Sequence, residues 1–189
     1  MEGIIKKSSQ LLFCFIVTIT INLFATANLF AADYLEVVDK NISFQWKING
    51  SNLDVILKAK TAGWVGVGFE PSMAMKDAHF IIGFIQNNKA TIEDHFGTGI
   101  NQHQAITALG GKDSISNKSG KLEKGETTLN FTIPLKASDK YHKNLDTGKD
   151  VVVLLAYSDK TSLLRKHPFY ASYSINLKSG AKKLLKHSK

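Results

Sequence analysis

The chain has 189 residues, 43% of them hydrophobic, and a formal net charge of +8 at pH 7 from 24 basic and 16 acidic side chains. This length favours one domain with a hydrophobic core of its own. The single cysteine, Cys14, lies in the N-terminal segment. Disulfide bonds and covalent haem attachment through a C-x-x-C-H motif are therefore excluded for the rest of the chain.

Residues 1–32 predict a secretory signal peptide. Two lysines precede the uncharged apolar run "LLFCFIVTITINLFATANLFAA", which ends in small residues, and this is the order of regions in a cleaved leader. We expect cleavage near Ala31 or Ala32, with Ala27 as an alternative, and export to a periplasm or out of the cell. A retained leader would act as a membrane anchor, because its apolar run approaches spanning length. Export argues against nucleic acid as a partner.

The remaining chain shows the period-2 alternation of half-buried strands and no helical stretch of convincing length. Alternating runs are "ISFQWKI" (42–48), "LDVILKAKT" (53–61), "LNFTIPL" (129–135) and "FYASYSINL" (169–177). The turn signals "NGSN", "QNNK" and "DTGKD" separate such runs. At least seven short strands with hairpin-like spacing predict an all-β fold, an antiparallel β-sandwich.

Two segments are apolar on both faces and predict central strands: "HFIIGFI" (79–85) and "VVVLLAYS" (151–158). The polar, glycine-containing stretch 97–125 predicts a long loop with at most one short strand. We expect the sandwich to span 33–178 and the basic residues 179–189 to form a disordered tail. That tail is either simply solvated or attracted to an anionic surface or an acidic partner.

No catalytic motif is present: the chain has no G-x-S-x-G, no H-E-x-x-H and no phosphate-binding loop. The acidic pair Glu93 and Asp94 stands in a strand-end context that is typical of a solvated face. The sequence therefore favours a binding or electron-transfer protein over an enzyme.

The strand "WVGVGF" places Trp64, Gly66 and Gly68 on one face. Two glycines on one face leave a flat floor where a ligand can approach the backbone. The alternative is that a large aromatic side chain from a facing strand fills this space.

The following connection, "PSMAMKDAH", contains Met73 and Met75. Methionines in such a place are commonly core residues that fill gaps. As ligands, their thioethers suit copper(I), or haem iron when a histidine is the second ligand.

His167 lies in the connection "KTSLLRKHPFY" between two strong strands. Pro168 restricts His167 to extended conformations and so helps to hold its ring in place. Arg165 and Lys166 are suited to carboxylates such as haem propionates. The alternative is a solvated histidine in a basic loop.

Three stretches resemble the DOMON domain, a family named for the N-terminal region of dopamine β-monooxygenase. They are "GWVGVGFEPSMAMKDAHFIIG", "LNFTIPL" and "VVVLLAYSDKTSLLRKHPFYASYSINL". The likeness spans roughly residues 35–177. The stretch "EDHFGTGINQHQAITALGGKD" is similar to that of bacterial single-domain members, in which a histidine recurs at His103.

The resemblance implies an immunoglobulin-like β-sandwich that binds haem b non-covalently or binds sugars. The cytochrome domain of cellobiose dehydrogenase is a haem-binding relative with Met and His axial ligands. By position, Met75 matches the ligand methionine and His167 the loop histidine. Trp64, Gly66 and Gly68 would then border the porphyrin, with Arg165 near its propionates. This implies one-electron transfer with a redox partner protein in the exported compartment.

Two departures from the family pattern stand in these motifs: His79 replaces an acidic residue, and "HPFYAS" lacks the Arg-Gly that often follows the loop histidine. Two other readings remain open. One is a copper site of Met73, Met75 and His79. The other is a sugar-binding module without cofactor that uses Trp46, Tyr170 or Tyr173, although alternation turns Trp46 and Tyr173 inward.

Overall fold

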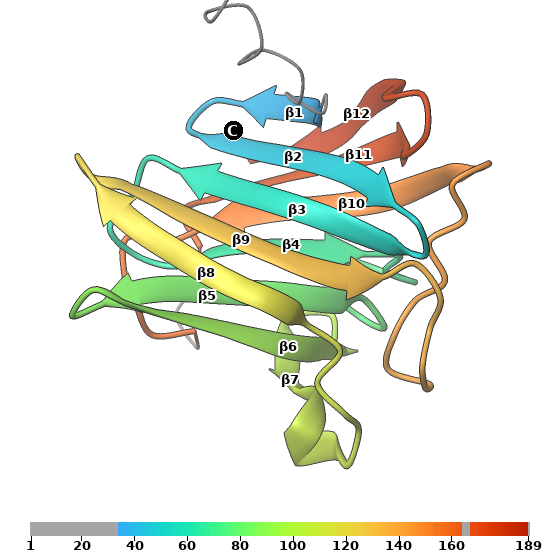
Figure 1. The fold of residues 1–189 in the computed structure, drawn as a ribbon, viewed down its shortest axis with the longest axis horizontal. Coiled ribbons are helices and arrows are strands. Elements are labelled where there is room, and N and C mark those ends of the chain that lie inside the picture. Colours follow the sequence, from blue (N-terminus) through green and yellow to red (C-terminus); the bar gives the residue numbers. More distant parts are fainter. Residues whose placement is uncertain (1–33, 164–166, 189) are drawn as a thin grey trace, which may run out of the picture. The chain divides into compact units, whose positions relative to one another are not determined.

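The computed structural model describes residues 34–163 and 167–188, which form two antiparallel sheets packed face to face (Figure 1). The five-stranded sheet has the order β1 (Leu35–Asp39), β2 (Ile42–Asn49), β3 (Asn52–Ala59), β9 (Glu126–Pro134), β8 (Ser116–Glu123). The seven-stranded sheet has the order β12 (Lys182–His187), β11 (Phe169–Asn176), β10 (Asp150–Tyr157), β4 (Val65–Phe69), β5 (His79–Gln86), β6 (Lys89–Gly99), β7 (Gln102–Ala105). The predicted all-β antiparallel sandwich is confirmed.

Strict alternation builds the core between the sheets. In β2 and β3, buried residues alternate with partly buried ones up to Trp46 and Ala59, and Phe44 and Trp46 have no exposed surface. Their rings stack with centroids 5.0 Å apart, and the Trp46 Nε1–H donates to the carbonyl oxygen of Leu177 over 2.9 Å. Burying an aromatic side chain of this size contributes about 1.5–3 kcal/mol. Trp46 and Tyr173 do face inward, as alternation predicted.

The two segments predicted as central strands hold interior positions. β10 lies between β11 and β4, and β5 lies between β4 and β6. The "QNNK" signal is a two-residue hairpin loop between β5 and β6, in which Asn87 and Asn88 have φ of 51° and 58°. Asparagine tolerates this left-handed conformation, which matches the strand twist of a tight hairpin.

The structure differs from the sequence prediction in two places. The stretch 97–125 contains the end of β6, β7, a short 3-10 helix (Ile106–Leu109) and β8. The sequence did not predict these strands because polar edge strands lack the apolar alternation that marks inner strands. In the predicted tail 179–189, Lys182–His187 forms β12, which pairs with β11 through backbone groups while all its side chains are exposed. The predicted signal peptide 1–32 lies outside the described residues.

Within the described residues, no helix is long and apolar enough to cross a membrane.

Candidate functional site

The outer face of the seven-stranded sheet carries the predicted glycine floor. Gly68 pairs with Phe80 of β5 and with Leu154 of β10, while Gly66 pairs with Ile82 and Ala156. Residues paired in this way point to the same side of a sheet. Since Val65, Val67 and Phe69 belong to the core, these partners form a largely apolar patch on the opposite side of β4.

Two side chains of β5 cover this floor. A Cβ added to Gly68 would overlap the ring of Phe80, and one added to Gly66 would lie 3.3 Å from Cγ1 of Ile82. The space left by the glycines is therefore filled, by neighbours on the same face and not by an aromatic from the opposite sheet. A planar ligand laid on β4 must displace the half-buried Phe80 ring.

Trp64 stands at the start of β4 with 4% of its surface exposed. Its backbone N–H donates to the carbonyl oxygen of Lys160, and its own carbonyl oxygen accepts from the N–H of Ser158. The indole Nε1 is buried and has no hydrogen-bond partner within the described residues. A buried donor without an acceptor is costly, so this N–H is suited to an acceptor on a ligand.

His167 is brought to Trp64 by the connection between β10 and β11. The half-buried ring lies edge-on to the Trp64 ring, with centroids 6.2 Å apart, and 5.6 Å from the ring of Tyr170. The structure thus unites two predicted site residues that are distant in sequence. Arg165 lies outside the described residues.

Met75 occupies the connection between β4 and β5, against β6. Its N–H donates to the carbonyl oxygen of Ile100, and its carbonyl oxygen accepts from Ala78. A Cβ on Gly97 would collide with that carbonyl oxygen, so Gly97 allows the connection to pack on the strand. Met75 is half-buried, whereas Met73 is 60% exposed.

The outer face of the seven-stranded sheet also carries a pair of histidines that the sequence analysis did not bring together. His95 Nδ1 lies 2.8 Å from His103 Nδ1, and His95 Nε2 lies 2.9 Å from the carboxylate of Glu93. The His103 ring is 6.0 Å from that of Phe80. Burial and the neighbouring His95 lower the pKa of His103 to about 4. No local sequence pattern links the two histidines, because only the pairing of β6 with β7 brings them together.

On the other side of β6, Asp94 is 4% exposed and lies between two buried histidines. Its Oδ1 is 2.6 Å from His79 Nε2, and its Oδ2 is 3.2 Å from His142 Nε2. The solvated-face interpretation is therefore wrong for Asp94. His79 is buried and faces this interior cluster, whereas Met73 is exposed. The structure therefore does not bring together these two residues of the copper hypothesis.

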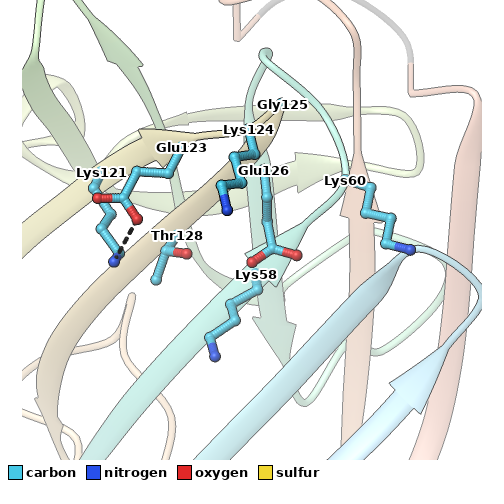
Figure 2. Close-up of a pocket in the computed structure, with 8 residues that line it drawn as sticks. All are labelled: Lys58, Lys60, Lys121, Glu123, Lys124, Gly125, Glu126 and Thr128. Carbon is cyan, nitrogen blue, oxygen red and sulfur yellow. Dashed lines mark hydrogen bonds and ion pairs between the residues drawn. The ribbon is translucent and has the colours of Figure 1, made fainter.

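A groove of about 470 Å³ lies elsewhere, on β3, β8 and β9 of the five-stranded sheet (Figure 2). It is lined by Lys58, Lys60, Lys121, Glu123, Lys124, Gly125, Glu126 and Thr128. Lys121 and Glu123 pair across 2.7 Å, and both are exposed. Solvent-exposed ion pairs of this kind are weak. The groove has more lysines than glutamates, so its net charge is positive.

The sheet order defines a class of protein, an antiparallel β-sandwich of one five-stranded and one seven-stranded sheet. The structure is similar to the cytochrome b domain of pyranose dehydrogenase from Coprinopsis cinerea, with a TM-score of 0.53 and 12% identity over 74% of this chain and 78% of that one. It is also similar to the cytochrome domain of Myriococcum thermophilum cellobiose dehydrogenase, with a TM-score of 0.49 and 12% identity over 68% of this chain and 69% of that one.

In sequence, residues 38–158 match the DOMON domain model. The chain belongs to the DOMON family. It is 29% identical over 112 residues to the human DBH-like monooxygenase protein 1, an alignment that covers 59% of this chain and 18% of that relative.

Proposed function

We propose that this protein is an exported b-type cytochrome that carries single electrons, with Met75 and His167 as the axial ligands of a non-covalent haem b. The observation that carries the proposal is that the connection holding His167 meets Trp64 just before the glycine strand β4, while the connection holding Met75 follows the same strand. The similarity in fold to cytochrome b domains supports it.

The donor set fits this group. A thioether together with an imidazole is a known axial pair of haem iron, and both Met75 and His167 are half-buried rather than enclosed in the core. The buried Trp64 Nε1–H can donate to a propionate, and the apolar neighbours Ile82 and Leu154 can exclude water. Haem b held by two protein ligands supplies one-electron transfer and offers no open position to a substrate.

The partner we propose is a second redox protein in the same exported compartment. An acidic contact surface on that partner would suit the excess of basic over acidic residues in the chain and the lysine-rich groove of Figure 2. Export itself rests on the predicted leader, so the location we propose is a periplasm or the cell exterior.

An absorption spectrum of the full-length protein tests the proposal, recorded as isolated and after haem addition, both oxidised and reduced with dithionite. We expect saturable uptake of one haem per chain and a low-spin reduced spectrum. Met75→Ala or His167→Ala should convert the spectrum to high spin. The matched controls Met73→Ala and His187→Ala replace exposed residues of the same kinds and should leave it unchanged.

The absence of saturable haem uptake at micromolar concentration would overturn the proposal. Elemental copper at one per chain would then support the copper reading, and binding on a sugar array without colour or metal would support the carbohydrate module.

A further inference from the structure

We propose that His79, Asp94 and His142 form a binding site for one divalent transition-metal ion of the zinc type, separate from the proposed haem face. Their ligand atoms all lie within 4.8 Å of one another. The three residues are 3%, 4% and 6% exposed. Two imidazoles and one carboxylate are a donor set suited to zinc and its neighbours in the first transition series.

The separation of each histidine from Asp94 is close to that in such a site. With metal–nitrogen and metal–oxygen bonds of about 2.0–2.1 Å, two ligands at a tetrahedral ion lie about 3.3 Å apart. His142 Nε2 and Asp94 Oδ2 are 3.2 Å apart, which is already this separation. His79 Nε2 and Asp94 Oδ1, at 2.6 Å, need to separate slightly to admit the ion.

His142 is held in the way that a metal-ligating histidine often is. Its Nδ1 lies 2.7 Å from Oδ1 of Asp139, while its Nε2 faces Asp94, so each ring nitrogen has a carboxylate as partner. A neutral imidazole carries only one N–H. A metal ion on Nε2 allows Nδ1–H to donate to Asp139, and this carboxylate–histidine–metal arrangement orients ligands in many metal sites.

Asp94 is also oriented by the loop that precedes β8. The backbone N–H and the hydroxyl of Ser114 both donate to its Oδ2 over 2.9 Å. Hydrogen bonds of this kind orient a ligating carboxylate towards an ion.

The site joins distant parts of the chain. His79 starts β5, Asp94 lies in β6, and His142 belongs to the connection between β9 and β10. The tight burial allows an ion but no substrate. The ion would therefore act as a clamp that holds this connection on the sheet.

The test uses the full-length protein after long incubation with a chelator, titrated with Zn²⁺ and with Co²⁺ as an optical probe. We expect one ion per chain, visible Co²⁺ bands of a low-coordinate site, a raised unfolding temperature with Zn²⁺, and no response to Ca²⁺. His142→Ala should abolish stoichiometric binding. Met75→Ala should bind Zn²⁺ as before, which separates this proposal from the haem proposal.

Asp139→Asn serves as a second variant if His142→Ala does not fold. Loss of such an outer carboxylate typically weakens metal binding 10–100-fold, and we expect the same here. Asp146→Asn changes an exposed aspartate of the same connection and should have no effect. Zinc binding that is absent, equal in all variants, or lost instead in His103→Gln would overturn the proposal.

Discussion

Asp94 and His95 are neighbours in β6 but belong to two histidine groups with opposite electrostatics. On the inner side, His79 and His142 both face the buried carboxylate of Asp94. On the outer side, His95 and His103 face each other through Nδ1, with the partly exposed Glu93 as the nearby acid. The pleat of one strand thus separates a group in which a carboxylate lies between two imidazoles from a group in which two imidazoles face each other.

The largest expected effect comes from breaking the inner group. Asp94→Asn removes the charge without changing the shape, and it leaves two buried histidines without their carboxylate. We expect a loss of about 3–5 kcal/mol in the free energy of unfolding, measured by urea denaturation at pH 7 without added metal. Glu93→Gln, the adjacent and partly exposed change, should cost less than about 1 kcal/mol.

The Asp94 carboxylate also predicts how the stability of the fold changes at acid pH. The pKa of Asp94 is depressed in the folded state, from 3.8 to about 2. Its stabilisation is therefore present above pH 4 and is lost as pH falls towards 2. If Asp94→Asn keeps the acid slope of the wild type over this range, the inner group does not behave as described.

The outer group, through His103, predicts a second change of stability with pH, at higher pH values. The pKa of His103 falls from 6.5 to about 4 on folding, so between these values the unfolded chain binds a proton that the haem-free folded chain does not. Stability must therefore decrease as pH is lowered from 6.5 to 4, by about 1–3 kcal/mol. His103→Gln should remove this part of the slope in urea denaturation, while His187→Gln should retain it.

A substitution at Gly97 tests whether the position of the Met75 connection matters for haem binding. Gly97→Ala places a methyl group against the Met75 carbonyl oxygen, which should displace the Met75 connection and cost about 1–3 kcal/mol. We also expect the low-spin haem spectrum to be lost. Gly99→Ala is the matched control, because its nearest neighbour, Oε1 of Gln102, is at an ordinary 3.5 Å. Equal haem spectra in both variants would argue against Met75 as a ligand.

The smallest expected effect concerns Gly68 of β4 and the Phe80 ring that covers it. Phe80→Ala uncovers Gly68, so a planar ligand no longer has to displace a ring, and haem should bind several-fold more tightly in a spectral titration. Phe84→Ala, a half-buried phenylalanine of the same strand, should not increase the affinity. Weaker binding in Phe80→Ala alone would mean that the ring contacts the ligand instead of blocking it.

The sequence by itself determined the sandwich, the two central strands and the inward direction of Trp46 and Tyr173. These features follow from period-2 alternation and turn residues, which act over a few neighbours in the chain. For the same reason the polar edge strands β8 and β12 were missed, because nearly all their side chains are exposed and only backbone pairing defines them.

Only the tertiary structure decided which chemical groups meet. His142 reaches Asp94 across 48 positions, and Trp64 meets His167 through a connection from another strand. Whether Gly68 is open or covered depends on the register that sets Phe80 beside it. Such contacts are set by strand register and by the packing of connections, which depend on the whole chain, so local pattern alone could not reveal them.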